Sequence, residues 1–378
     1  MKLDANVKCL FEVFKSCNKK LYIVGGAVRD YLLGNESYDY DFTTDATPDE
    51  IIEILHDYQL DTYQKDLGSV KVHLGNNIYE ITTMRKEYGV TNYRYPEKVI
   101  FVNDLKDDVL RRDFTCNALG YNPDEGVVDY INGINDIRNK LIKFIIDPSE
   151  SISLDPIRLI RALRFSKTLG FDIDENTYSI MSSNAFKVSF LGVIRFNELF
   201  RLLSIDDSYE FIKKHFTIYA AAYPEINQDI FKKLLDSNIN YKLLKIAICF
   251  VAKIDISLTK EELNILDGLK LVNYQDQSLY NTKLLLIKYQ NNFEHILEIL
   301  SALGYVKEFY NNLNIIRNEN HPLYIKDLKI TYLDLENLGV NKKYYTKLLK
   351  HLLNEVLLDK SKNSKDKLIE CIKSTPID

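Results

Sequence analysis

The sequence predicts an α+β protein in which a head built on a mixed β-sheet is followed by an all-helical remainder. Two observations predict this division. Up to about residue 146, short runs rich in Val, Ile, Tyr and Thr are bounded by Gly-Asn, Asn-Gly and other turn signals. From residue 155 to residue 373, apolar residues recur instead at the spacing of amphipathic helices.

The head is expected to contain short strands alternating with a few helices. The predicted strands are, in chain order, residues 21–25, 38–44, 69–74, 78–84, 98–102, 127–131 and 141–145. Helical periodicity appears at residues 27–33 and 47–58, where Thr47 can cap the helix and Pro48 takes its first position. Together these segments indicate a domain built on a mixed sheet.

The remainder is expected to be helical throughout. Its clearest amphipathic stretches are residues 155–169, 195–203, 241–254, 280–289, 293–313 and 344–358. A chain of 378 residues suggests two to four domains or subdomains. We expect a head (1–146), a neck (147–210), a helical body (211–323) and a helical tail (324–378).

Composition is ordinary for a globular protein in water, with 46% apolar and 27% charged residues. No apolar run could span a bilayer, and the first residues are too charged for a secretory signal. The five cysteines are scattered and form no CxxC pair, which favours reduced thiols and a cytoplasmic location. The net charge of −5 argues weakly against nucleic acid, although binding depends on where the basic residues lie.

A pair of aspartates is the first candidate site. Asp39 and Asp41 are separated by one residue, so in a strand both carboxylates point to one face. Like charges at this spacing repel each other unless a cation lies between them, and Mg²⁺ suits such oxygen ligands. Alternatively, the pair is a solvated polar face on an edge strand, which is the better interpretation of an isolated D-x-D.

The surroundings of this pair favour a site. Glu80 shares a strand face with Thr82, and an adjacent strand could bring it beside the aspartates. Gly26 follows a strand and opens a helix that contains Arg29, an arrangement in which backbone N–H groups can approach a phosphate. Taken alone, two glycines are more often only a turn.

Two further stretches carry candidate nucleotide contacts. In LRRDFTCNALGY, Arg111 and Arg112 can clamp phosphates and Asn117 can bond a ribose, or the arginines can simply pair with neighbouring aspartates. In LDPIRLIRALRF, one helical stripe presents a carboxylate and several guanidinium groups, or it is an exposed helix with internal ion pairs. The stripe consists of Asp155, Arg158, Arg161 and Arg164.

In this order, GGAVRDYLLG, DYDFTT, GSVKV, EITTMR, RRDFTCNAL, DYINGINDI and DPIRLIRALRF resemble the class II tRNA nucleotidyltransferases. These are the bacterial-type CCA-adding enzymes, which share their head with bacterial poly(A) polymerases. The resemblance covers residues 20–170 closely. It implies a polymerase-β-type nucleotidyltransferase head, followed by a neck, body and tail that hold tRNA, and a reaction that uses Mg²⁺, CTP and ATP.

The resemblance also assigns roles to single residues. It implies that Asp39 and Asp41 bind the metal, with Glu80 as a possible third carboxylate. Gly26 and Arg29 would hold the triphosphate, Arg111 or Arg112 would contact the nucleotide, and Asn117 would lie near the ribose. The neck would select CTP and then ATP through Asp155, Arg158, Arg161 and Arg164.

The chain departs from the family pattern at three places. Leu154 stands where the family usually has Glu, Asn132 replaces the first of two glycines, and Asn92 replaces an Asp in a mobile loop. The loop keeps a comparable length and Arg94, which argues against a relative that adds only C. The tail, with four lysines at 342, 343, 347 and 350, resembles the CCA-adding tail more than that of poly(A) polymerases.

The predicted function is therefore addition of C, C and A to the tRNA 3′ end. The alternatives are a poly(A) polymerase, a relative that adds only C or only A, and a small-molecule nucleotidyltransferase. A non-catalytic tRNA-binding protein is the alternative from a different functional class.

Overall fold

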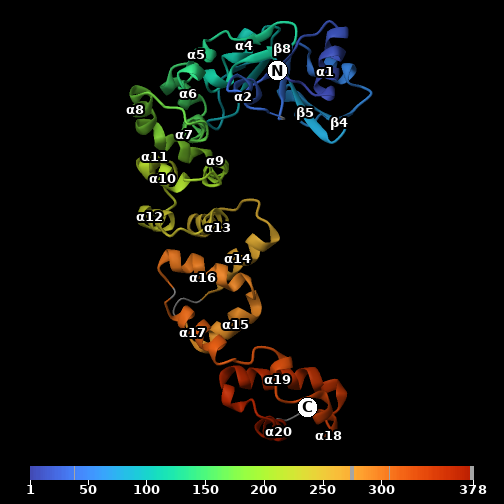
Figure 1. The fold of residues 1–378 in the computed structure, drawn as a ribbon, viewed down its shortest axis with the longest axis vertical. Coiled ribbons are helices and arrows are strands. Elements are labelled where there is room, and N and C mark those ends of the chain that lie inside the picture. The colour runs from blue at the N-terminus through green and yellow to red at the C-terminus, as the bar shows by residue number, and fades with distance from the viewer. Residues whose placement is uncertain (38, 273–275, 306, 375–378) are drawn as a thin grey trace. The chain divides into compact units, whose positions relative to one another are not determined.

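In a computed structural model, the chain forms two compact units, Met1–Pro224 and Glu225–Asp378. The structure describes residues 1–37, 39–272, 276–305 and 307–374. All strands of these residues belong to the first unit, and the second unit is helical (Figure 1). This agrees with the predicted division into a sheet-containing head and a helical remainder, whereas the finer boundaries within the helical part stay a prediction.

The head is built on a seven-stranded mixed sheet with the order β3-β4-β5-β2-β1-β8-β9. Strands β2 and β5 are parallel, and the other neighbours are antiparallel. The strands are β1 (Leu21–Val24), β2 (Asp41–Thr44), β3 (Gln59–Asp61), β4 (Ser69–Leu74), β5 (Asn77–Thr83), β8 (Gly120–Asn122) and β9 (Gly126–Val128). The site described below lies on the central pair β2 and β5.

Helices and short turns surround this sheet. They are α1 (Ala5–Ser16), α2 (Gly26–Leu32), α3 (Pro48–Ile54), η1 (Lys65–Leu67), α4 (Leu105–Val109), η2 (Thr115–Asn117) and α5 (Gly133–Arg138). Helix α3 begins as predicted, with Pro48 in its first turn and a reciprocal capping box between Thr47 and Glu50. Near β1, buried side chains including Tyr22, Val24 and Met84 form one compact apolar cluster.

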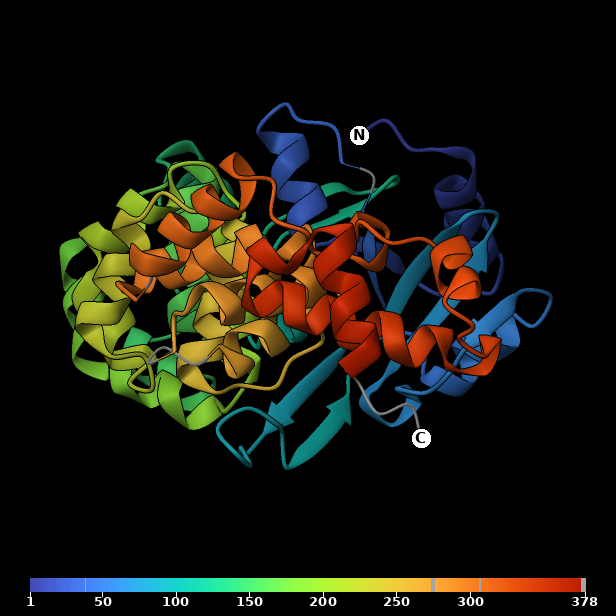
Figure 2. The same ribbon diagram turned by 90° about the horizontal axis from the view of Figure 1, so that it is seen from below.

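A separate two-stranded ribbon consists of β6 (Arg85–Tyr88) and β7 (Lys98–Phe101). It follows β5 directly and projects from the main sheet as the pair of teal arrows in Figure 2. The loop that joins its strands, residues 89–97, lies within the segment between Arg85 and Arg111 for which the resemblance implies a mobile loop.

Several strand predictions need correction. The strand predicted at 38–44 begins only at Asp41, so Asp39 lies in the preceding loop. Residues 141–145 form only isolated bridges, at Leu141 and Phe144, because their partners Asp172 and Phe114 lie outside any strand. The strand predicted at 127–131 ends at Val128. Strands β3, β6 and β8 were missed because they are short and have little apolar character, so that only pairing with β4, β7 and β1 defines them.

The turn before α5 explains the change from glycine to Asn132. Asn132 adopts a left-handed backbone conformation (φ 66°), which Asn tolerates better than most residues. Asp129 accepts hydrogen bonds from the backbone N–H groups of Ile131, Gly133 and Ile134. The turn therefore keeps the required backbone with Asn in place of the first glycine.

We expect Gly133→Ala to destabilise the protein by about 3 kcal/mol, because overpacking of this severity lies at the upper end of such costs. A Cβ at Gly133 would lie 2.2 Å from the backbone oxygen of Thr115, where no flexible side chain can move aside. Urea denaturation followed by circular dichroism measures the loss. Gly126→Ala is the comparison: a Cβ there meets nothing within 4 Å, so only its positive φ of 76° should cost stability, about 1–2 kcal/mol. Equal stability losses in both variants would contradict the prediction.

The first unit continues after the head with helices only. They are α6 (Pro148–Leu154), α7 (Ile157–Leu169), α8 (Glu175–Asn184), η3 (Ala185–Leu191), α9 (Ile194–Leu203), α10 (Ser208–Lys214) and α11 (Phe216–Ala222). Helix α7 carries Arg158, Arg161 and Arg164 of the predicted stripe, but Asp155 lies outside it, as the residue that ends α6. The helix contacts α6, α9 and η3. Its position against the head brings the stripe to the candidate site.

The second unit contains the following helices and short turns: α12 (Gln228–Asp236), α13 (Tyr241–Ala252), α14 (Lys260–Leu271), α15 (Leu279–Tyr289), α16 (Asn292–Leu303), α17 (Lys307–Asn318), η4 (Ile325–Asp327), α18 (Tyr332–Asn337), η5 (Lys342–Tyr344), α19 (Tyr345–Leu358), η6 (Lys360–Lys362) and α20 (Lys365–Ser374). The single helix predicted at 293–313 is divided because Gly304 ends α16 in a left-handed conformation (φ 91°). Within the described residues, none of the helices combines the length and apolar character needed to cross a bilayer.

Candidate active site

The turn after β1 brings Arg29 into contact with Asn117 and Asp30. Gly25 has a positive φ of 75°, which lets the chain reverse sharply into α2. Arg29 is buried and donates from Nη1 to Oδ1 of Asn117 at 2.6 Å, and from Nε and Nη2 to Oδ1 of Asp30. A Cβ at Gly26 would lie 3.4 Å from Nη2 of Arg29. The structure thus brings Gly26, Arg29 and Asn117 together.

The acidic face lies on the parallel strand pair. Asp41 stands directly opposite Glu80 in the register of β2 and β5. Tyr40 and Phe42, the neighbours of Asp41, are buried, as the alternation of strand side chains requires. The side chain of Asp41 still reaches solvent. Desolvation by the surrounding protein, and then the charges of Asp39 and Glu80, raise its pKa above the ordinary value, and Arg112 offsets this only in part. The strand register therefore places Glu80 beside Asp41, whereas its role as a third carboxylate stays a prediction.

This acidic face suits a hard divalent cation. Among the residues that the structure describes, no three or more His, Cys, Asp or Glu side chains are grouped to hold a metal ion. Glu80 is engaged by Ser69, whose Oγ donates to its carboxylate at 2.5 Å. The carboxylates of Asp39 and Asp41 remain, and their repulsion is the kind that a bound cation relieves. Two carboxylates fit Mg²⁺ when substrate phosphates complete its coordination.

The tandem arginines are held by one buried carboxylate. Asp108 is fully buried and accepts from Nε of Arg111 at 2.8 Å and from Nη2 of Arg112 at 2.9 Å. It also accepts from the backbone N–H of Arg85 at 3.2 Å. Burial alone would raise the pKa of Asp108, but the charges of Arg112 and Arg111 hold it below its ordinary value. The pairing with Asp108 therefore fixes both guanidinium groups and does not exclude a role in binding.

Helix α7 joins the head through two arginines of the predicted stripe. Arg158 donates to the backbone oxygen of Arg111 at 2.7 Å and to Oγ of Ser151 at 2.9 Å. Arg161 donates from Nε to Oδ2 of Asp113 at 2.9 Å, in an ion pair with the same carboxylate. The stripe therefore faces the RRD segment of the head.

The sequence did not point to two residues that organise this stripe. Glu198 of α9 is buried and forms ion pairs with Arg164 at 2.7 Å, Arg201 at 2.9 Å and Arg161 at 3.8 Å. The ring of Phe165 lies under three guanidinium groups, those of Arg29, Arg161 and Arg164, at 4.3 to 5.5 Å from its centroid. Both residues stand inside stretches that were recognised as helical, but only the tertiary packing reveals their partners.

A cavity of about 300 Å³ opens where α7 meets the head and the β6–β7 ribbon. Polar groups of four segments converge on it, which is typical of a small-molecule site. Its lining includes Glu87, Arg94, Arg111, Leu154, Asp155 and Arg158. Burial raises the pKa of Asp155, although Arg94 and Arg158 partly offset the effect. Of the predicted template, Asp155 and Arg158 line this cavity, whereas Arg161 and Arg164 do not.

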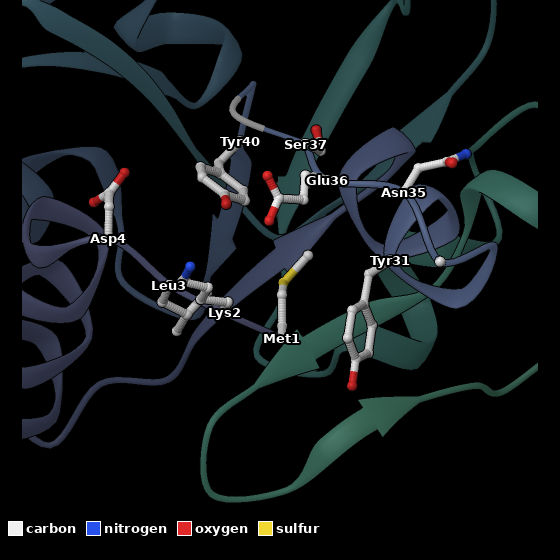
Figure 3. Close-up of a pocket in the computed structure, with 10 residues that line it drawn as sticks. Met1, Lys2, Leu3, Asp4, Tyr31, Asn35, Glu36, Ser37 and Tyr40 are labelled. Carbon is white, nitrogen blue, oxygen red and sulfur yellow. The ribbon is translucent and has the colours of Figure 1, made fainter.

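A second cavity, of about 350 Å³, lies between the amino-terminal segment and the loop after α2 (Figure 3). Figure 3 shows Asp4, Glu36, Tyr31 and Tyr40 around it. None of the predicted site residues lines this cavity. Of these two cavities, only the one at α7 is lined by residues predicted to contact the nucleotide, namely Arg111, Asp155 and Arg158. It is referred to as the nucleotide cavity.

Known proteins resemble the chain in sequence and in fold. A family described as "Poly A polymerase head domain" matches residues 21–143. A CCA-adding enzyme of Staphylococcus saprophyticus is 32% identical over 340 residues, which cover 85% of this chain and 83% of that relative. Another, from Staphylococcus epidermidis, is 44% identical over 176 residues, but the match covers only 47% of this chain and 44% of that relative.

A solved structure extends the resemblance to the fold of nearly the whole chain. The Thermotoga maritima CCA-adding enzyme complexed with tRNA_CCA has a TM-score of 0.64 at 19% identity. The comparison covers 98% of this chain and 96% of that one. At this identity the similarity supports the fold, a nucleotidyltransferase head followed by helices.

Proposed function

This chain belongs to the family of CCA-adding enzymes, and we propose that it adds C, C and A to the 3′ end of tRNA. In the proposed reaction, the terminal 3′-oxygen of the RNA forms a bond to the α-phosphorus of CTP or ATP. The bond from that phosphorus to the bridging oxygen breaks, and pyrophosphate leaves. The observation that carries the proposal is the cavity in which Asp155 and Arg158 lie beside Arg111.

Asp39 and Asp41 are the residues that we expect to hold the metal. Bound Mg²⁺ would stabilise the charge that develops on the attacking oxygen and the leaving pyrophosphate. Arg29 lies under the Gly26 turn, where the start of α2 suits an anion, and we assign this region to the triphosphate. Asn117 is fixed by Arg29 and would lie near the ribose.

The polarity of the cavity supports selection of C and A. Both bases carry an exocyclic amino group, whose N–H can donate a hydrogen bond to a carboxylate such as that of Asp155. The guanidinium of Arg158 can donate to the adjacent ring nitrogen, because its hydrogen bonds to Ser151 and Arg111 use only part of its five N–H donors. Uracil and guanine present the opposite polarity at these positions and would leave buried groups unpaired.

Incorporation of labelled nucleotides tests the proposal. Purified protein with Mg²⁺ and tRNA lacking its terminal CCA should add two C residues, then one A, and stop. Repeated addition of A without C would identify a poly(A) polymerase instead. Absence of incorporation, with intact tRNA binding, would identify a non-catalytic tRNA-binding protein.

Arg158→Ala should relax nucleotide choice more than it weakens tRNA binding. We expect the ratio of kcat/KM for CTP over UTP to fall at least about tenfold, since a good base-edge contact contributes roughly 1–3 kcal/mol of discrimination. Single-turnover incorporation measures the ratio, and filter binding measures the RNA affinity. Lys167→Ala, on the same helix but outside the cavity, is the control; an unchanged ratio in the Arg158 variant would remove it from the template.

We also place the reaction in the cytoplasm. Cys9 and Cys17 are exposed and form no disulfide. Exposed thiols without disulfide partners are typical of a reducing compartment.

A further inference from the structure

Three aromatic side chains form an exposed patch beside the nucleotide cavity. The aromatic patch consists of Tyr93, from the loop between β6 and β7, and Phe186 and Phe190 of η3. The ring centroids of Tyr93 and Phe190 are 5.0 Å apart, and those of Phe186 and Phe190 are 5.9 Å apart. Each side chain is about half exposed, at 48%, 50% and 49% respectively. The patch therefore joins the head to the helical neck and still offers open ring surface.

The backbone holds Tyr93 in this position at an energetic cost. Asn92 and Tyr93 both have left-handed conformations, with φ of 52° and 59°. Such a conformation is uncommon for a bulky side chain and persists only when its surroundings impose it. Here Thr91 and Tyr95 close the turn through paired backbone hydrogen bonds of 2.7 and 3.0 Å. The exposed ring is thus presented by a closed turn and not by a loose loop.

The patch borders the nucleotide cavity from two sides. Arg94 follows Tyr93 directly and lines that cavity. On the other side, Lys187 lies between the two phenylalanines and donates from Nζ to Oγ of Ser153 at 2.9 Å. Ser153 precedes Leu154, which also lines the cavity. Two cationic residues, Arg94 and Lys187, are thus chain neighbours of the rings, and Arg94 also lines the proposed nucleotide site.

We propose that the aromatic patch stacks an unpaired base of the RNA 3′ end. The inference rests on the proposed function, because that function requires a single-stranded RNA end next to the bound nucleotide. Exposed rings interleaved with cations are the arrangement by which proteins hold single strands, and every base has a face that can stack. A stacking contact tolerates any base, which suits an end whose last residue changes with each addition.

Binding to short RNA hairpins tests the patch without requiring catalysis. The probes are a fluorescent hairpin with a three-nucleotide 3′ overhang and the same hairpin with a blunt end. For the double variant Tyr93→Ala/Phe190→Ala, we expect about tenfold weaker binding of the overhang hairpin. Binding of the blunt hairpin should not change. The dependence of affinity on salt should also keep its slope, because no cation is removed.

Matched variants separate stacking from folding. Tyr63→Ala removes an aromatic side chain that is 94% exposed on the same unit and should leave both affinities unchanged. Phe190→Tyr keeps a ring and should retain overhang binding, while circular dichroism and thermal melts report the fold of each variant. Equal losses for overhang and blunt hairpins, or no loss in a folded double variant, would overturn the proposal.

The test of the aromatic patch and the test of nucleotide incorporation can fail independently of each other. If overhang-specific binding depends on the patch but no CTP is incorporated, the proposed function fails and the stacking site stands. If incorporation proceeds normally in the double variant with unchanged RNA affinity, the stacking site fails and the proposed function stands. A variant that loses CTP affinity but keeps overhang binding would assign the rings to the incoming nucleotide and would also overturn the proposal.

Discussion

Asp41→Asn is expected to lower the rate of nucleotide incorporation on the order of a thousandfold, as for other groups that stabilise developing charge in a transition state. Asparagine keeps the shape of the side chain but removes the charge that we assign to metal binding. The rate of CTP addition to tRNA lacking CCA measures the effect at saturating Mg²⁺. Near-normal turnover in this variant and in Asp39→Asn would remove both residues from the catalytic site.

The same substitution should stabilise the metal-free protein at neutral pH. The pKa of Asp41 is raised in the folded protein by desolvation and by the charges of Asp39 and Glu80. A raised carboxyl pKa means that folding favours the protonated form, so the ionised carboxylate costs stability once the pH exceeds that pKa. Thermal melts in EDTA at pH 7 should therefore show a higher Tm for Asp41→Asn, with a gap that narrows as the pH falls. Asp66→Asn, at an exposed position, is the control and should leave the Tm unchanged. A lower Tm for the Asp41 variant would contradict the expectation.

Asp108→Asn is expected to have the largest effect on stability, a loss of about 3–5 kcal/mol, because breaking a buried pair leaves charges uncompensated. Asp108 is fully buried and pairs with both Arg111 and Arg112. Since those arginines border the nucleotide site, the KM for CTP should rise as well. Chemical denaturation measures the loss of stability, and steady-state kinetics measure the change in KM.

The pH dependence of this loss distinguishes charge from packing. The pKa of Asp108 is lowered in the folded protein, so its contribution is present above the unfolded-state pKa of about 3.9 and is lost as the pH falls below it. The difference between wild type and variant should therefore be full at pH 7 and shrink below about pH 4. Asp107→Asn, which removes only the partly exposed pair with Lys86, should cost little at either pH. A difference independent of pH would point to packing.

Local patterns in the sequence predicted most of the fold. Strand alternation, Gly-containing turns and the Thr47 cap depend on neighbouring residues, and the structure confirms them. Errors arose where pairing, and not the composition of the segment, decides whether a strand forms. Strand β3 is defined only by β4, and residues 141–145 look like a strand but find no continuous partner. Gly304 was visible in the sequence, and its left-handed conformation is what divides the predicted helix.

The site was predictable as a set of residues but not as a set of contacts. The sequence placed Asp155 and Arg158 on one stripe with Arg161 and Arg164, yet only the first two line the nucleotide cavity. Arg164 instead pairs with Glu198, which lies 34 residues away in the chain. No spacing rule links such distant residues, since tertiary packing alone brings α7 and α9 together. The assigned roles of the site residues stay predictions until variants are measured.

The parallel pairing of β2 and β5 has a consequence for how this chain can evolve. Asp41 and Glu80 face each other only because the two strands pair in one register, which Thr43 reinforces by donating to the backbone oxygen of Thr82 at 3.0 Å. A shift of one residue would turn Glu80 to the opposite side of the sheet. Insertions and deletions should therefore accumulate in the turns on either side of β4 and be absent between Glu80 and Thr83. Selection on this acidic face would then conserve the lengths of the segments around it as well as the residues that form it.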